Sequence, residues 1–292
     1  MNRQNIMRAL GYLAGVFLFF APFAYYQKTL AAWLQAAPAG DIHDFCLRIP
    51  LLNALTGKPL EVVSVAFISL VLLVVTAFLL GPVFCGRLCA SGALPEYLSR
   101  LVPDKYKIDW QKSVSPVPIR YGFLAGYLVS PLVAGSIACA LCNYNFLERL
   151  VVGGIQRDIG VLGSTAMITA ILWLGIFGIL AKGGRGFCSY LCPVGAVQSA
   201  VHSLGARLGF TYKLKLLADK CVGCGQCARQ CPMGALSVGK EGLHYQVLNC
   251  VTCRQCEDAC PKKALAYGVG ERGWRSSRLE TPAKEGALEY IK

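Results

Sequence analysis

Long apolar runs separated by short polar segments are the first feature of this sequence. Four runs, at about residues 9–34, 62–84, 121–141 and 161–181, consist mainly of Leu, Val, Ile, Phe, Ala and Gly. A helix of ~20 apolar residues is long enough to cross the hydrocarbon core of a membrane. The pattern predicts a mainly α membrane protein with four transmembrane helices. The first run is long for a signal peptide, which favours a retained helix over a cleaved leader.

The composition agrees with this pattern. Of the 292 residues, 55% are hydrophobic and only 15% are charged, and the mean hydropathy is +0.49. These values are high for an ordinary soluble domain. The net charge of +13 raises the alternative of nucleic-acid binding. No nucleic acid is expected as a partner, because the basic residues form no stripe interleaved with aromatic residues.

The positions of the basic residues predict an orientation in the membrane. The segment between the second and third runs carries six of them: Arg87, Arg100, Lys105, Lys107, Lys112 and Arg120. Loops rich in Lys and Arg face the cytoplasm. We therefore expect a multi-pass protein of the bacterial inner membrane with both termini and the C-terminal region cytoplasmic, where thiols stay reduced.

Two cysteine runs dominate the C-terminal third. Both read Cys-x2-Cys-x2-Cys-x3-Cys-Pro, the first from Cys221 to Pro232 and the second from Cys250 to Pro261. Such runs bind the two [4Fe–4S] clusters of bacterial ferredoxins, and the fourth cysteine of each run ligates the other cluster. Cluster I is then expected to use Cys221, Cys224, Cys227 and Cys260, and cluster II Cys231, Cys250, Cys253 and Cys256.

Structural zinc and a disulfide knot are the alternatives for these cysteines. Zinc sites use two separated cysteine pairs rather than two runs of four that each end in Cys-Pro. The resemblance to bacterial-type ferredoxins covers about residues 212–268. We expect a four-helix transmembrane domain at 1–204, a small α+β ferredoxin domain with two [4Fe–4S] clusters at 205–270, and a flexible tail at 271–292.

An internal repeat places four more cysteines in a pattern. Cys85 and Cys89 match Cys188 and Cys192 at a constant offset of 103 residues, and each pair follows an even-numbered apolar run. The membrane part thus reads as two parallel repeats. Residues four apart share a helix face, so two such pairs offer four thiolates. A third iron–sulfur cluster is one interpretation, and redox-active or structural thiols are the other.

Three further cysteines form a weaker group on the predicted outer face: Cys46, Cys139 and Cys142. The spacing of Cys139 and Cys142 permits a redox or metal site, but no histidine follows Cys142, so the attachment signature of c-type haem is absent. Packing in a helix and a disulfide with Cys46 are the alternatives.

With four apolar runs, two Cys-x3-Cys motifs and a C-terminal two-cluster ferredoxin, the chain resembles the NapH-type membrane polyferredoxins over roughly residues 60–268. These are related to the NosR, methylamine-utilisation (MauN) and CcoG-type membrane [4Fe–4S] proteins. One departure is Ala90, where the family pattern has proline after the second cysteine. Proline is not a ligand, so ligation is retained while the turn is less constrained.

The resemblance implies an electron-transfer subunit of a quinol dehydrogenase complex. It would relay electrons between the quinone pool and a partner redox protein, such as a ferredoxin, a cytochrome or a reductase subunit, in anaerobic respiration. The alternative is an accessory membrane reductase for copper or iron handling or for oxidase assembly. No catalytic residue of the chain's own is predicted.

Overall fold

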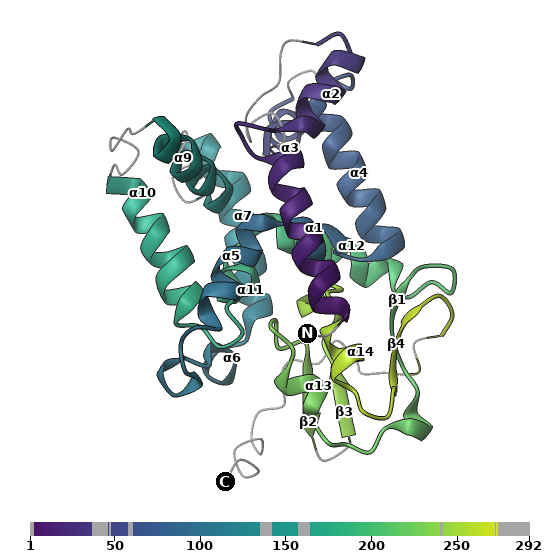
Figure 1. The fold of residues 1–292 in the computed structure, drawn as a ribbon. Coiled ribbons are helices and arrows are strands. Elements are labelled where there is room, and N and C mark those ends of the chain that lie inside the picture. The colour runs from purple at the N-terminus through teal and green to yellow at the C-terminus, as the bar shows by residue number, and fades with distance from the viewer. Residues whose placement is uncertain are drawn as a thin grey trace.

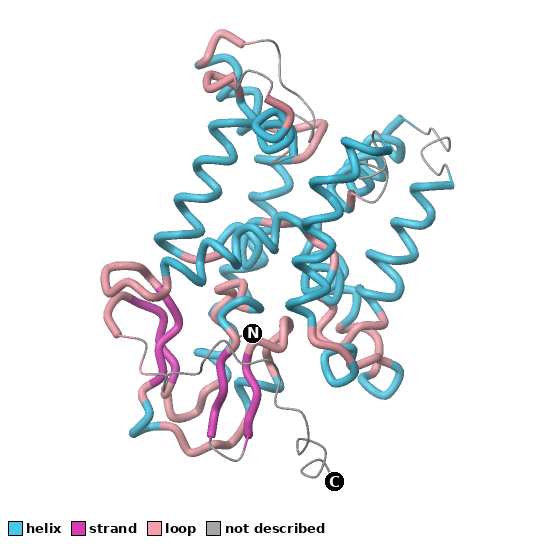
Figure 2. Tube along the Cα trace, turned by 180° about the vertical axis from the view of Figure 1, so that it is seen from behind, coloured by secondary structure: helices cyan, strands magenta, loops and turns pink. Residues whose placement is uncertain are grey.

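The computed structural model describes residues 3–36, 46, 48–57, 61–134, 142–156, 164–239, 242–271 and 273. Within these residues, a helical part stands above a smaller part that carries the β-strands (Figure 1). Seen from behind, the strands form two separate pairs below the helices (Figure 2). The N-terminus lies beside the smaller part, so the first helix touches both parts.

The helical part is built from short and medium helices. In chain order its α-helices are α1 Arg3–Phe19, α2 Tyr25–Trp33, α3 Arg48–Leu55, α4 Val65–Leu80, α5 Ala90–Ser99, α6 Trp110–Ser113, α7 Pro116–Ala134, α9 Asn143–Gln156, α10 Ser164–Thr169, α11 Gly186–Tyr190 and α12 Pro193–Gly205. Two π-helical segments, Phe84–Leu88 and Ala170–Ile179, and one 3-10 turn, Asp104–Tyr106, complete it.

The smaller part contains two antiparallel strand pairs and two very short helices. Strand β1 Lys213–Leu216 pairs with β4 Leu265–Gly268, and β2 Leu236–Gly239 pairs with β3 Gly242–Tyr245. The helices are α13 Gln226–Arg229 and α14 Gln255–Ala259, with 3-10 turns at Ala218–Lys220 and Val247–Asn249. The predicted α+β arrangement of this region agrees with these elements. The predicted tail 271–292 lies outside the described residues except for Glu271 and Gly273.

The prediction of four transmembrane helices is wrong. Nowhere in the part of the chain that the structure describes is a helix both long and apolar enough to cross a membrane. Helices α1 and α4 have 17 and 16 residues, or about 26 and 24 Å, whereas the hydrocarbon core is ~30 Å thick. Helix α7 has 19 residues but contains Arg120. The fourth run gives only six α-helical residues in α10 before the π-helical segment begins.

The predicted location in the bacterial inner membrane is wrong for the same reason. The predicted location depended on the four transmembrane helices. The predicted cytoplasmic orientation of the termini depended in turn on that location. The first run, expected to be one retained membrane helix, is divided into α1 and α2 by a turn at residues 20–24. Apolar composition indicated the positions of helices but gave no information on where each one ends.

A buried ion cluster joins α1, α5 and the turn that precedes α11. The Glu96 side chain is 2% exposed. Its Oε2 accepts hydrogen bonds from Arg8 at 2.7 Å and Arg185 at 2.6 Å. Both guanidinium groups also donate to the Tyr12 hydroxyl, which donates to the Gly86 carbonyl at 2.6 Å. This buried ion cluster connects segments that lie far apart in the chain.

Electrostatics in the buried ion cluster depend on the single carboxylate. Burial alone would raise the pKa of Glu96, but Arg185 and Arg8 outweigh it and lower this pKa to about 2. A carboxylate with a lowered folded-state pKa stabilises the fold above its unfolded pKa. This stabilisation is therefore complete at neutral pH and is lost as the pH falls from about 4.5 towards 2.

Replacement of Glu96 by glutamine should destabilise the protein strongly. The Glu96→Gln variant keeps the size of the side chain but leaves two buried arginines without their carboxylate, which costs roughly 3–5 kcal/mol. Anaerobic urea unfolding measures the loss. The control is Glu257→Gln, which breaks an ion pair with Arg254 whose side chain is 33% exposed and should cost below ~1 kcal/mol. Equal losses in the two variants would contradict a structural role for the buried ion cluster.

Candidate metal centres

The cysteines of each predicted ferredoxin cluster line a common cavity. Cys221, Cys224, Cys227 and Cys260, here called the first ferredoxin set, surround one cavity. Cys231, Cys250, Cys253 and Cys256, the second ferredoxin set, surround another. Each cavity therefore takes three cysteines from one run and the fourth from the other run, which is the exchange expected from the sequence. Ligation itself stays a prediction.

The loops that carry these cysteines share one backbone conformation. Gly223 and Gly225 adopt positive φ angles of 68° and 69° in the first run. The equivalent residues of the second run, Thr252 and Arg254, adopt 48° and 62° although neither is glycine. Left-handed backbone is costly for a β-branched residue such as threonine. Thr252 and Arg254 nevertheless adopt positive φ angles. The fold therefore maintains the shape of the loop even where the residue type does not favour it.

Backbone N–H groups are directed at the sulfur atoms. Ala235 donates to Cys231 Sγ at 3.3 Å, and the equivalent Ala264 donates to Cys260 Sγ at 3.2 Å. Thr252 N lies 3.4 Å from Cys250 Sγ. Such donors stabilise negative charge on cluster-ligating sulfur. The residues present therefore fit a [4Fe–4S] cluster in each cavity.

The four repeat cysteines, here called the repeat set, come together in the core of the helical part. Cys85, Cys89 and Cys192 are buried in one apolar cluster, and Cys188 packs against it. The Gly92 amide donates to Cys89 Sγ at 3.3 Å, while a side chain at Gly92 would come within 3.4 Å of Cys188 Sγ. The two repeats thus bring their thiols to one place, as the offset of the repeats suggested.

The local geometry of the repeat set differs from the expectation of one shared helix face. Cys89 and Cys192 are the N-cap residues of α5 and α12, whereas Cys85 and Cys188 lie in the preceding helical turns. Each pair therefore spans the junction between two helices. Helix N-termini favour negative charge, which suits thiolate ligands. Helix α5 begins at Ala90, the position at which α12 begins with Pro193. The helix therefore starts at the same place in both repeats, with or without the proline.

Side chains outside the cysteine motifs complete the repeat set. Gln198 Nε2 donates to Cys85 Sγ at 3.0 Å, and the Tyr144 hydroxyl lies 3.3 Å from Cys89 Sγ. The sequence predicted neither contact, because both join residues more than 50 positions apart. The only signal in the sequence was that Gln198 and Tyr144 are polar residues within mostly apolar segments.

Buried positive charge surrounds the repeat set. Arg120 donates to the carbonyl groups of Cys188 at 2.7 Å, Ser189 at 2.9 Å and Leu248 at 2.7 Å. It is 2% exposed. Among the ion pairs of the described residues, none joins Arg120 to a carboxylate. Arg185 approaches from the other side and donates to the Cys85 carbonyl at 2.7 Å.

The thiols of the repeat set are hard to ionise without a metal. Burial raises the pKa of Cys85 and Cys192, and neighbouring cysteines of the set raise both further. Burial also raises the pKa of Cys188 to about 11, although Arg185 opposes this effect. Iron binding must therefore displace protons from these thiols.

The repeat set is in contact with the second ferredoxin set. A side chain at Gly86 would come within 2.1 Å of the Val251 carbonyl and 3.1 Å of the Cys253 amide, so the two backbones meet there. In the second repeat, the equivalent Ser189 donates to Met233 Sδ at 3.7 Å. Both repeats thus contact the loops that hold the second ferredoxin set.

Within the described residues, no group of three or more His, Cys, Asp or Glu side chains meets as it would around a single metal ion. A four-iron cluster binds each thiolate at a different iron, so its ligands need not converge on one point. Of the predicted outer group, Cys139 lies outside the described residues. Cys46 and Cys142 are both partly buried, and that group stays a prediction.

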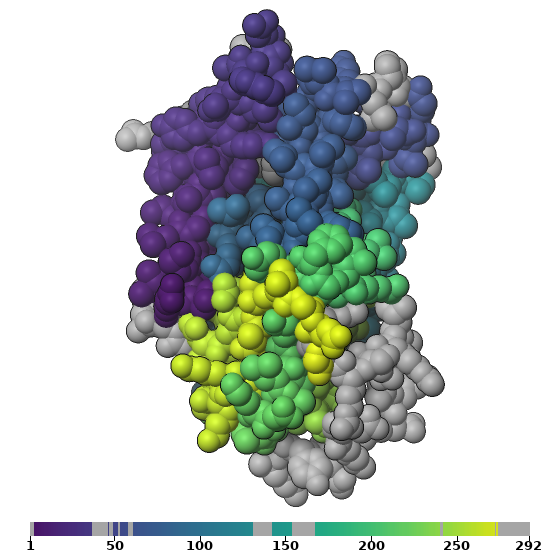
Figure 3. Space-filling view, turned by 90° about the vertical axis from the view of Figure 1, so that its right-hand side faces the viewer, coloured from purple at the N-terminus to yellow at the C-terminus, as the bar shows by residue number. Residues whose placement is uncertain are grey.

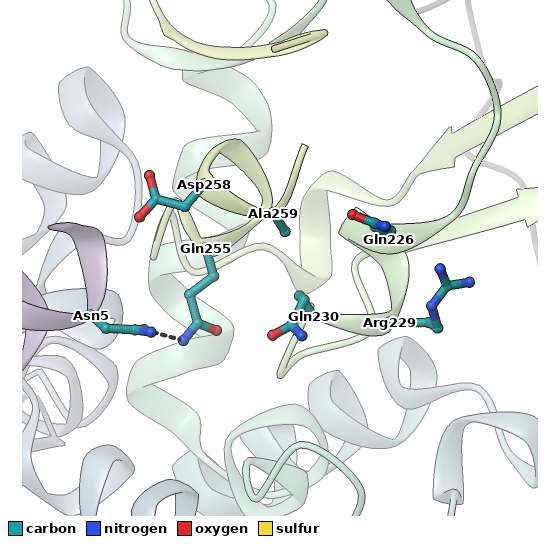
Figure 4. A pocket seen from close by; sticks show the side chains of 7 residues that line it. All are labelled: Asn5, Gln226, Arg229, Gln230, Gln255, Asp258 and Ala259. Atoms are coloured by element: carbon teal, nitrogen blue, oxygen red, sulfur yellow. Dashed lines mark hydrogen bonds between the residues drawn. The ribbon is translucent and has the colours of Figure 1, made fainter. Parts of the chain in front are cut away.

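An open cavity of about 610 Å³ lies between the two short helices of the smaller part. Figure 4 shows Gln226, Arg229 and Gln230 on one side of it and Gln255 and Asp258 on the other. Asn5 of α1 closes one end through its contact with Gln255 at 3.1 Å. The lining is mostly amide groups, and no cysteine of the three sets is among the residues that line it.

Comparison with known proteins supports iron–sulfur chemistry in both parts. The family model described as "4Fe-4S dicluster domain" matches residues 220–264. The model described as "4Fe-4S binding domain" matches twice, at residues 63–109 and 165–211. The double match coincides with the two repeats that carry Cys85, Cys89, Cys188 and Cys192.

Several curated proteins are similar to this chain. YccM of Escherichia coli (strain K12), provisionally named an electron transport protein, is 27% identical over 71% of this chain and 58% of its own length. The methylamine utilization ferredoxin-type protein MauN of Methylobacillus flagellatus is 26% identical over 68% of this chain and 63% of its own. The uncharacterized protein MJ0749 of Methanocaldococcus jannaschii is 29% identical over 57% of each.

The chain spans about three-fifths of the length of the curated relatives it matches. No solved structure matches it significantly. The domain matches define the class of domains: the chain contains [4Fe–4S] ferredoxin domains, and of its relatives one is provisionally named an electron transport protein and another a ferredoxin-type protein. The more specific NapH-type resemblance stays a prediction.

Loss of either ferredoxin set should remove one cluster. The full-length variants Cys221→Ser/Cys227→Ser and Cys250→Ser/Cys256→Ser, prepared anaerobically, should each contain about four irons fewer than the parent protein, because a cubane holds four irons. Iron analysis and the visible charge-transfer absorption measure the change. Cys46→Ser, which lines neither cavity, is the control. Stoichiometric zinc without visible absorption would contradict the assignment.

Proposed function

We propose that the protein passes electrons between two redox partners along three [4Fe–4S] clusters, one in each cysteine set. When bound, such a cluster accepts and releases one electron at a time. The protein's own contribution is to hold the three sets in a row, to shield two of them from water and to balance their charge. The chain supplies a path for electrons, and any reaction of substrate takes place on its partners.

The observation that supports the third cluster most strongly is the balance of buried charge. Arg120 and Arg185 are buried beside the repeat set, and Arg185 shares the buried Glu96 carboxylate with the buried Arg8 of the ion cluster. A cubane core of about +2 with four thiolates has a net charge of about −2. Three arginines, one glutamate and this anion give a neutral interior. Four protonated thiols would leave two buried positive charges uncompensated, at a cost of several kcal/mol.

The contacts between the sets support an order for the relay. The repeat set meets the second ferredoxin set through Gly86 and Ser189. The second and first ferredoxin sets each take a cysteine from the other's run, so they are neighbours as well. The order is therefore repeat set, second ferredoxin set, first ferredoxin set. Exposure increases along this row, from the buried Cys85 to the exposed Cys224.

We further propose a quinol as the electron donor, on the basis of the sequence resemblance alone. A quinol releases two electrons and two protons on oxidation, and carriers that accept single electrons in turn can take up these two electrons one after the other. The resemblance implies a ferredoxin, a cytochrome or a reductase subunit as the acceptor.

Removal of either cysteine pair of the repeat set should remove one whole cluster. Two ligands cannot hold a cubane well, so Cys85→Ser/Cys89→Ser and Cys188→Ser/Cys192→Ser should each lower the iron content by about four per chain. Both variants should keep the two ferredoxin clusters, as measured by iron analysis and electron paramagnetic resonance of the reduced protein. Unchanged iron in both variants would contradict a third cluster and favour a thiol function.

Reduction by a water-soluble quinol tests the proposed donor. Menadiol, added anaerobically, should bleach the visible absorption of the parent protein and should do so at least tenfold more slowly in the Cys188→Ser/Cys192→Ser variant. Dithionite, which can reach the exposed first ferredoxin set directly, is the control and should reduce both proteins. Equal rates with menadiol would show that quinol does not act through the repeat set.

A further inference from the structure

The two halves of the ferredoxin region are related by an offset of 29 residues, yet their surroundings differ. Val222 in the first half and Val251 in the second follow the first cysteine of each run. Val251 is 6% exposed and packs in the core beside Gly86, whereas Val222 is 64% exposed. The same residue at the same loop position is therefore covered in one half and open in the other.

The covering element in the second half carries the repeat set. The loop with Val251 contacts the turn that follows Cys85, and Met233 contacts the turn that follows Cys188. This face of the second half thus receives the repeat set. By the internal symmetry, the first half presents an equivalent face that no described residue covers.

Three lysines of the open face have uncharged counterparts at the covered face. Lys220 and Lys262 line the cavity of the first ferredoxin set, and Lys263 follows. The equivalent residues around the second ferredoxin set are Asn249, Met233 and Gly234, the first two being 2% and 1% exposed. Lys220, Lys262 and Lys263 are all exposed. The difference follows the difference in burial, since a lysine cannot be buried without a partner.

The charge at this face is locally in excess. Segments 218–225 and 260–264 carry three lysines and a single acidic residue, Asp219. Arg229 adds a further cation, because its guanidinium donates to the Cys224 carbonyl at 3.2 Å. Cys224 is exposed at the same place. In Figure 3 the C-terminal region, coloured green to yellow, lies below the helical part.

We propose that Lys220, Val222, Cys224, Lys262 and Lys263 form a docking face for an electron-transfer protein that has an acidic surface around its own redox centre. The proposal rests on the proposed function, because it requires a cluster in the first ferredoxin set. An exposed apolar residue ringed by cations suits a small, transient interface in which opposite charge accelerates encounter. The second half of the ferredoxin region is then in permanent contact with the turns that carry the repeat set, whereas the first half binds the partner protein reversibly.

Two cobalt complexes of opposite charge test the face directly. Tris(oxalato)cobaltate(III), an anion, and hexaamminecobalt(III), a cation, each take one electron from the reduced protein as Co(III) becomes Co(II). At low ionic strength, the Lys262→Glu/Lys263→Glu variant should react about tenfold more slowly than the parent with the anion and faster with the cation. The differences should vanish near 1 M salt, where the screening length is about 3 Å.

A matched variant separates local from overall charge. Lys105→Glu/Arg207→Glu makes the same change in net charge at exposed positions that do not line the cavity, and its rates should stay within twofold of the parent. If it slowed the anion as much as Lys262→Glu/Lys263→Glu does, overall charge rather than this face would control the rate, and the proposal would be overturned.

Binding without electron transfer gives an independent readout. An oxidised flavodoxin with an acidic rim, titrated calorimetrically into the oxidised protein, should bind at low salt, and about tenfold more weakly to the Lys262→Glu/Lys263→Glu variant than to the parent. Equal affinities would overturn the docking face. Iron is counted first: a parent protein without iron at the first ferredoxin set contradicts the proposed function, whereas full iron with unchanged rates and affinities contradicts the docking face alone.

Discussion

The repeat set lies in a dry interior, and buried positive charge lies directly beside it. The cysteine sulfur atoms are met there by buried guanidinium groups, by N–H groups directed at sulfur and by the helix N-termini at Cys89 and Cys192. Each arginine also joins elements that are distant in the chain. Arg120 connects α7 to the carbonyl groups of Cys188 and Leu248. Charge compensation and the placement of the cysteine sets are therefore achieved by the same contacts.

The chain contains two internal repeats, one in the helical part and one in the ferredoxin region, and their copies are arranged differently. The repeats of the helical part converge, because their four thiols meet in one core. The halves of the ferredoxin region diverge, because one faces this core and the other faces away from it. Val251 and Val222 occupy equivalent positions and differ tenfold in exposure, 6% against 64%. Repetition of sequence has thus produced three similar sets of cysteines with different access to water.

The helical part shows where reasoning from hydrophobic runs reaches its limit. An apolar run indicates that a segment is removed from water, but a protein core and a bilayer core both satisfy that condition. The run from residue 62 gives an α4 of only 16 residues, because Gly81 with a φ of 72° ends the helix. In the run from residue 161, a π-helical segment replaces regular α-helix after Thr169. Helix ends depend on such local features rather than on composition.

The spacing of the cysteines was enough to group them into sets. Within Cys221–Cys231 and Cys250–Cys260 this spacing matches the reach of a loop around a cluster, which is a local property of the chain. The offset of the repeats likewise indicated that Cys85, Cys89, Cys188 and Cys192 act together. These inferences required no knowledge of packing, because the chemistry of the cluster dictates the pattern.

How the cysteine sets are supported and connected depends on contacts between distant segments of the chain. Gln198 and Cys85 are 113 positions apart, and Arg8 and Glu96 are 88 apart. No short pattern in the sequence records such a pair, because each contact arises when separate helices pack. The exposure of Val222 and the burial of Val251 are equally invisible in two nearly identical loops. Whether a residue is buried depends on which other segment packs against it, and the fold as a whole decides which segment that is.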